Sequence, residues 1–125
     1  MAFTNAIFHP MLAAAAETAV EASLHTGDPG TTGDNEVSGG DYTRVPVGWN
    51  APASGAITAD SDLVFLVPPL GSDEVTHVGL RNANGDWLGD APAAVPQPFP
   101  TAGTATVEVL TLDMTTGVMV ATIDS

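Results

Sequence analysis

The chain has 125 residues, and its fifteen acidic side chains face only two basic ones, Arg44 and Arg81, which gives a formal net charge of −13. Nucleic-acid binding needs a basic surface that displaces counterions from phosphates, and attraction to an anionic membrane needs one as well, so we expect neither partner. The absence of cysteine excludes disulfides, thiolate metal sites and cysteine nucleophiles. The length and an apolar fraction of 44% are typical of one packed domain, which we expect over residues 1–125.

An alanine-rich run of strong helix formers predicts a helix at about residues 5–17. Pro10 fits the first turn of a helix that starts at that residue, or it kinks a helix that starts near Thr4 or Asn5. One side of either helix carries Phe8, Met11, Leu12 and Ala15. We expect this side to pack on a sheet or to dock against a neighbouring subunit.

The apolar period changes from helical to alternating after the helix, and residues 20–25 predict a half-buried strand. The strand ends at Gly-Asp-Pro-Gly, residues 27–30, which is a strong turn signal. The polar stretch at residues 31–41 is expected to be a surface loop. His25 and His77 occupy alternating strand positions, and we expect both histidines at the surface or in an interface.

Further strands are predicted at residues 42–47, 56–59, 63–67 and 76–81. Pro46 places the first of these at an edge or at a strand end. Residues 63–67 read Leu-Val-Phe-Leu-Val, and this wholly apolar run favours a central strand covered on both faces. Asn84-Gly85 favours a two-residue type I′ turn, which would return the chain into a strand around Trp87.

Four prolines in residues 91–100 predict an extended connection that is neither helix nor ladder strand. Residues 104–113 form the longest strand candidate, residues 115–117 a turn and residues 118–123 a last strand. The sequence therefore predicts a mainly β fold: an antiparallel β-sandwich or small barrel of about eight short strands at residues 19–124, with one N-terminal helix.

The sequence lacks the known motifs of catalytic, phosphate-binding and metal-binding sites. No serine lies in a Gly-x-Ser-x-Gly elbow, and no phosphate-binding loop or metal-spaced histidine pair exists. The oxygen-rich residues Asp28, Asp34 and Glu36 lack the spacing of a calcium loop and are typical of turns. We therefore expect no enzyme activity, no catalytic or metal-binding residue and no cofactor. Aromatic side chains that could line a sugar-binding patch, but more often anchor a core, are Phe65, Phe99, Trp49 and Trp87.

The segment Leu-His-Thr-Gly-Asp-Pro-Gly at residues 24–30 is followed by Gly-Asp-Asn-Glu-Val-Ser-Gly-Gly-Asp-Tyr-Thr-Arg at residues 33–44. This pair of segments resembles a family of small virion proteins from tailed bacteriophages, especially phages of actinobacteria. The alanine-rich start, Trp49 and the Thr-His-Val-Gly-Leu strand at residues 76–80 are also similar to that family.

The resemblance implies a structural role in the virion, as a minor tail or tail-fibre-associated protein that binds other virion proteins as a homo-oligomer and is assembled in the host bacterial cytoplasm. Alternatives are a capsid decoration protein and a host-surface sugar-binding module. The motif residues are expected to fix turns, and Arg44 to pair with Asp28, Asp41 or Glu36. These motif residues are His25, Asp28, Pro29, Gly30, Gly39, Gly40, Tyr42 and Arg44.

Overall fold

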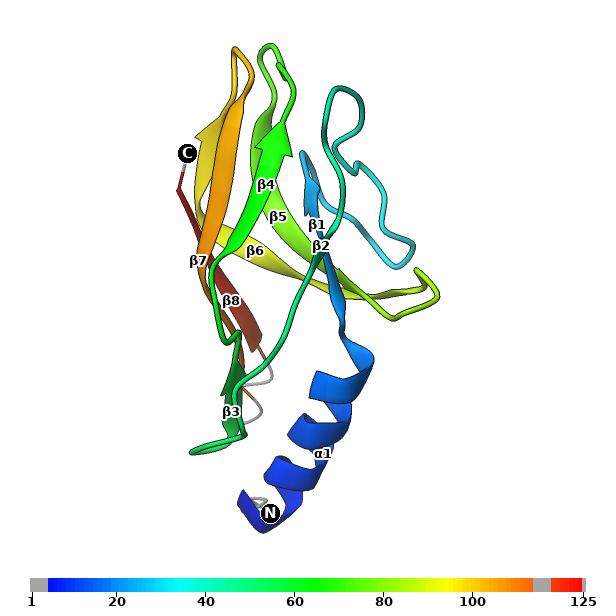
Figure 1. Ribbon diagram of the computed structural model, residues 1–125, viewed down its shortest axis with the longest axis vertical. Coiled ribbons are helices and arrows are strands. Elements are labelled where there is room, and N and C mark those ends of the chain that lie inside the picture. Colours follow the sequence, from blue (N-terminus) through cyan, green and yellow to red (C-terminus); the bar gives the residue numbers. More distant parts are fainter. Residues whose placement is uncertain (1–4, 114–117, 125) are drawn as a thin grey trace.

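A computed structural model describes residues 5–113 and 118–124 as one helix and a strongly curled sheet (Figure 1). The elements are α1 (Asn5–Thr18), β1 (Glu21–His25), β2 (Val45–Pro46), β3 (Ala56–Thr58), β4 (Leu63–Val67), β5 (Glu74–Arg81), β6 (Trp87–Pro98), β7 (Gly103–Asp113) and β8 (Val118–Asp124). Mainly β structure, eight strands and one N-terminal helix confirm the predicted fold class. The predicted turn at residues 115–117 lies outside the described residues.

The eight strands form one sheet in the order β2-β1-β5-β6-β8-β7-β3, and β4 also pairs with β7. β4 pairs with the first half of β7, whereas β3 pairs with its end. Pairing is antiparallel except between β6 and β8, which are parallel neighbours at Ala93 and Ala121. The curl encloses a single cluster of buried apolar side chains, which includes Phe65 and Phe99. These two aromatics are therefore core anchors rather than parts of a binding patch.

The helix begins at Asn5, so Pro10 lies inside it. Leu12 is completely buried, but the neighbouring Met11 is 50% exposed. The side chain of Phe8 lies outside the described part of the chain. Only part of the predicted apolar side is thus packed within one molecule. α1 lies at one end of the sheet, next to β3 (Figure 1).

The prediction that β1 is half-buried is wrong, because both of its faces are covered. Ser23 and His25 on the polar face are as fully buried as Leu24 on the apolar face. The loop after β1 folds back along the strand, and the Val37 amide donates to the Leu24 carbonyl at 2.9 Å. Trp87 covers the side chain of His25, with 5.1 Å between the ring centroids. The surface position expected for His25 is therefore also wrong, while His77 is half-buried.

The prediction that residues 63–67 form a central, doubly covered strand is wrong as well. Within the described chain β4 pairs with β7 alone, so it is an edge strand. Its side chains alternate between buried Leu63, Phe65 and Val67 and exposed Val64 and Leu66, which are 54% and 53% exposed. An apolar run alone cannot distinguish two covered faces from one covered face and one aliphatic exposed face.

The expected proline-rich connection is instead most of β6, which includes Pro92, Pro96 and Pro98. Prolines cannot donate to a ladder, so they are tolerated only where a ladder bond is not needed. β6 meets β8 at only one described residue pair, and its register with β5 shifts between Val75 and His77. Pro92 and Pro98 nevertheless face His77 and Glu74 of β5, so these prolines lie within the sheet and not in a separate connection.

The hairpin between β5 and β6 is confirmed, but its turn is longer than predicted. The Asn82 amide donates to the Asp86 carbonyl at 3.1 Å, and the Gly85 amide donates to the Asn82 carbonyl at 2.9 Å. Gly85 has a φ of 83°, whereas Asn84 is not among the described residues with positive φ. This is the three-residue hairpin turn that ends in a left-handed glycine, not a two-residue type I′ turn.

Candidate functional site

Two of the motif residues, Tyr42 and Arg44, converge with Arg81 on one carboxylate, that of Glu36 in the loop after β1. Arg44 binds it through two hydrogen bonds of 2.9 Å, from Nε to Oε2 and from Nη2 to Oε1. The Tyr42 hydroxyl donates to Oε2 at 3.0 Å, and Arg81 Nη2 donates to Oε1 at 3.3 Å. The same Tyr42 hydroxyl accepts the amide of Leu24 in β1 at 3.0 Å. The loop is therefore tied to β1 and β5 by side chains.

The electrostatics of this cluster hold each group in its usual ionisation state. Burial acts to raise the pKa of Glu36, but hydrogen bonds from Arg44 and Tyr42 and the charges of both arginines outweigh burial and lower that pKa. The hydrogen bond with Glu36 raises the pKa of Arg44, and burial raises the pKa of Tyr42. Glu36 and Arg44 thus stay charged and Tyr42 stays protonated. The cluster therefore holds the loop in place by hydrogen bonds and ion pairs that do not change with protonation near neutral pH.

Arg81 extends the cluster toward the turn between β5 and β6. Its guanidinium carbon lies 5.1 Å from the centre of the Trp87 ring, a cation–π distance. Its Nη1 donates to the Gly85 carbonyl at 3.1 Å. Both basic side chains of the protein therefore contact Glu36, and Arg81 is nearly buried. Neither arginine provides a separate positive patch on the outside.

His25 and Ser23 form a pair that resembles a nucleophile and its base, but substrate cannot reach it. The Nδ1 atom lies 2.7 Å from the Asp34 carbonyl, which can only accept, so Nδ1 carries the proton. Nε2 then accepts from the Ser23 hydroxyl at 2.9 Å. Both side chains are 0% exposed, so the pair is structural. Burial lowers the pKa of His25 and outweighs its bond to Asp34, so the ring stays neutral.

The turn residues hold the start of the loop. The Asp28 carboxylate accepts the Gly30 amide at 2.9 Å, and Gly30 has a φ of 63°. Pro29 is buried, and its carbonyl accepts the amides of Gly33 and Asp34 at 3.0 and 2.8 Å. These local bonds place the Asp34 carbonyl against His25.

Gly39 and Gly40 reverse the loop before Tyr42. Both have positive φ, at 97° and 55°, a conformation that side chains other than glycine adopt with strain. A Cβ at Gly40 would also lie 3.1 Å from the side chain of Pro68. The reversal brings Tyr42 over the core, where its ring stacks on Phe65 at 6.3 Å.

His25, Tyr42 and Arg44 are therefore brought together around the loop, whereas Asp28, Pro29 and Gly30 lie at its start and Gly39 and Gly40 near its end. Sequence reasoning named Glu36 as one of three possible partners of Arg44 and as one of the oxygen-rich turn residues, but not as the centre of a cluster. It missed Ser23, Arg81 and Trp87 in this cluster. The small number of cationic side chains could have indicated this cluster. In a chain with a net charge of −13, both arginines are expected to pair with carboxylates.

Within the part of the chain that the structure describes, no three His, Asp or Glu side chains are placed to hold a metal ion. No helix among the same residues is long and apolar enough to cross a membrane. Trp49 donates its indole N–H to the Ala19 carbonyl at 2.8 Å, so it too is used internally.

Fold and site together define a small, acidic, mostly β protein whose polar motif residues brace its own loop. A family model described as "Podophage GP4 fiber I protein gp80" matches residues 2–115, and the chain therefore belongs to this family of phage fibre proteins. Membership supports a structural, tail-fibre-associated role in a bacteriophage particle. No curated protein and no protein of solved structure matches the chain.

Proposed function

We propose that this protein is a non-enzymatic component of a tailed bacteriophage particle, associated with the tail fibre, and that it acts by binding other virion proteins. The family match over residues 2–115 carries this proposal. The complete burial of Ser23 and His25 is consistent with it, because substrate cannot reach this hydroxyl–histidine pair.

Several finer points are proposed with it. The eight motif residues serve as the loop's architecture, and residues 1–125 form one β domain. The protein associates with copies of itself, is assembled in the cytoplasm of the bacterial host and comes from a phage of actinobacteria. A tail position is favoured over capsid decoration because the family is one of fibre proteins. The internal contacts of Trp49 and Trp87 argue against a sugar-binding patch.

Quantitative mass spectrometry of purified particles tests the proposal. We expect the protein in the particle, in the tail fraction after heads and tails are separated, at a copy number close to that of the fibre subunits. A copy number close to that of the capsid subunit, in the head fraction, would indicate capsid decoration instead. Absence from purified particles would refute a virion role altogether.

A further inference from the structure

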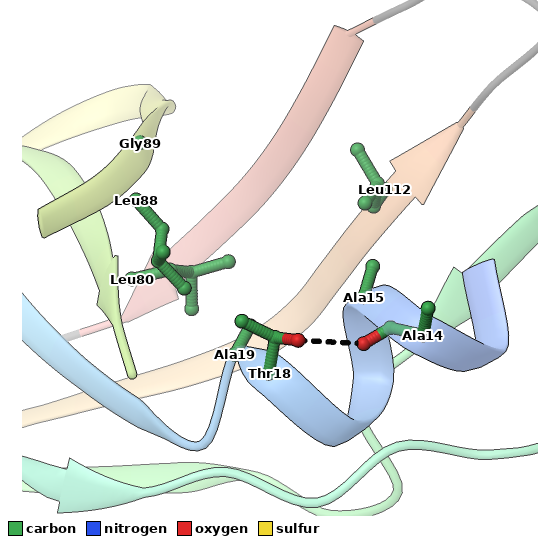
Figure 2. Close-up of a pocket in the computed structure, with 8 residues that line it drawn as sticks. All are labelled: Ala14, Ala15, Thr18, Ala19, Leu80, Leu88, Gly89 and Leu112. Carbon is green, nitrogen blue, oxygen red and sulfur yellow. Dashed lines mark hydrogen bonds between the residues drawn. The ribbon is translucent and has the colours of Figure 1, made fainter. Parts of the chain in front are cut away.

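An apolar pocket of about 380 Å³ opens between α1 and the sheet, bordered by the core residues Ala19 and Leu80 and separate from the Glu36 cluster. The described residues that line it are Ala14, Ala15, Thr18, Ala19, Leu80, Leu88, Gly89 and Leu112. Figure 2 shows leucines from β5, β6 and β7 on one side and the alanines of α1 on the other. We call this the helix–sheet pocket.

The helix–sheet pocket is suited to an apolar side chain. Among the described lining residues the one polar side chain is that of Thr18, whose hydroxyl already donates to the Ala14 carbonyl at 2.8 Å (Figure 2). Leu88 is 44% exposed, and a Cβ built on Gly89 would meet no atom within 4 Å. The pocket is therefore open at the surface, so a side chain of a binding partner could enter it. An aliphatic or aromatic side chain inserted there would be stabilised by burial and would lose no hydrogen bond.

The negative charge of the protein around this pocket determines which kind of partner segment can place an apolar side chain in it. Glu17 precedes Thr18 on α1, and Asp90 follows Gly89 on β6, where it lies 3.9 Å from His77 Nε2. The two arginines contact Glu36 and do not line the pocket. With a net charge of −13, the surface of the chain would attract a basic segment to this pocket more than an acidic second copy, so we expect copies of the chain to associate through another surface.

We propose that the helix–sheet pocket receives an apolar anchor residue from a lysine- or arginine-flanked segment of another virion protein. The inference rests on the proposed function and adds the binding site and the chemistry of the partner. The pocket supplies the apolar contact, and the anionic surface of the chain attracts the flanking cations.

A photo-crosslinking experiment in assembled particles tests it. A benzophenone amino acid replaces Leu88, and the matched control carries it at Val95, which is also on β6 and 62% exposed but does not line the pocket. We expect Leu88 to crosslink to another virion protein, at an apolar residue with lysine or arginine within a few positions. Crosslinks to a second copy, to an acidic segment or at the same yield as at Val95 would overturn the inference.

Filling the pocket gives a second test. Gly89→Leu places a side chain in the open space and should reduce incorporation into particles about tenfold or more, since one buried anchor contributes at least that factor in affinity. Ala13→Leu, on the exposed side of α1, is the control and should incorporate normally. An unchanged melting temperature of Gly89→Leu shows that the fold is intact, and normal incorporation of such a folded variant would refute the site.

These outcomes are separable from failure of the proposed function. If the wild-type protein is absent from particles, the virion role fails. If it is present but Leu88 does not crosslink and Gly89→Leu incorporates normally, the virion role stands and only the pocket inference fails.

Discussion

At the scale of single residues, Glu36 is the position on which the loop depends. Arg81 has a side-chain exposure of only 9%, and Glu36 is the carboxylate that it contacts. Removing one partner of a nearly buried ion pair leaves the other charge uncompensated, which costs much more than the pair itself contributes. The arrangement therefore makes Glu36 more important to stability than its place in a polar loop indicates.

We expect Glu36→Gln to lower the free energy of unfolding by about 2 kcal/mol or more, because it removes the charge that faces both arginines. Urea denaturation measures the change. Glu21→Gln is the control: Glu21 lies 3.5 Å from Arg44, both side chains are more than a third exposed, and such pairs contribute at most about 1 kcal/mol. Equal losses in the two variants would contradict the central role of Glu36.

The pH dependence of stability follows from His25. Its pKa is lowered in the folded state from the ordinary 6.5, so below pH 6.5 the unfolded chain binds a proton that the folded chain does not. Stability contributed by neutral His25 is thus complete above pH 6.5 and decreases as the pH falls toward the folded pKa. Glu36, whose pKa is lowered from 4.5, adds a second decrease below pH 4.5.

Urea denaturation between pH 7 and pH 5 should therefore show a loss of stability in the wild type, with a slope of at most about 1.4 kcal/mol per pH unit for one proton. His25→Gln removes the titrating group, and its slope in this range should be smaller. Glu36→Gln should keep the slope, since Glu36 titrates lower. A wild-type slope retained in His25→Gln would show that another group is responsible.

At the scale of elements, the hairpin of β5 and β6 offers a matched pair of glycines. A Cβ at Gly79 would collide with the Trp87 ring and with the Ser23 hydroxyl, whereas a Cβ at Gly89 on the facing strand would touch nothing. Neither has the positive φ that strains other residues. The two positions therefore differ in the space available, and Gly79 allows the Trp87 ring to lie over His25.

Gly79→Ala should lower the free energy of unfolding by roughly 1–3 kcal/mol, the usual cost of overpacking, and should shift the tryptophan fluorescence as Trp87 moves. Gly89→Ala should leave stability and fluorescence close to those of the wild type. Thermal denaturation followed by fluorescence measures both. A Gly79→Ala variant that melts like the wild type would mean that the Trp87 contact is not a constraint.

Local signals in the sequence were sufficient for the helix, the number of strands and the β5–β6 hairpin, because propensity, alternation and turn residues act over a few positions. Strand placement was not predictable in the same way. The run Leu63–Val67 gave no sign that β4 would pair with β7 alone. The prolines of β6 argued against a strand because a proline cannot donate a ladder hydrogen bond, although the strand accommodates them. At the site, the turns depend on local sequence, but Arg81 and Glu36 are 45 residues apart and approach each other only because β5 pairs with β1.

At the scale of the whole molecule, negative charges far outnumber positive ones. Both arginines contact Glu36, so two cationic side chains serve fifteen carboxylates and the negative charges of the described residues largely face one another. Glu108 illustrates the crowding, because a hydrogen bond with Asp124 and the charges of Asp124 and Asp62 raise its pKa. Mutual repulsion of this kind favours expanded states over the compact fold.

Added salt should therefore stabilise the protein. Raising the ionic strength from about 0.01 M to about 0.15 M shortens the Debye length from about 30 Å to about 8 Å and screens the repulsion, while the partly buried Glu36 cluster is screened less. We expect the melting temperature to rise by a few degrees, measured by circular dichroism with sodium chloride. A decrease would mean that attractive pairs dominate the electrostatics.

The aliphatic edge strand β4 has a practical consequence for handling the protein. An edge with exposed Val64 and Leu66 is a template on which sheets of separate molecules could extend one another, and at neutral pH the like charge of all copies opposes that contact. The opposition disappears near the isoelectric point, which is about 4.1. Purification and storage well above that pH should prevent edge-to-edge extension of the sheets, and acidification toward it should precipitate the protein.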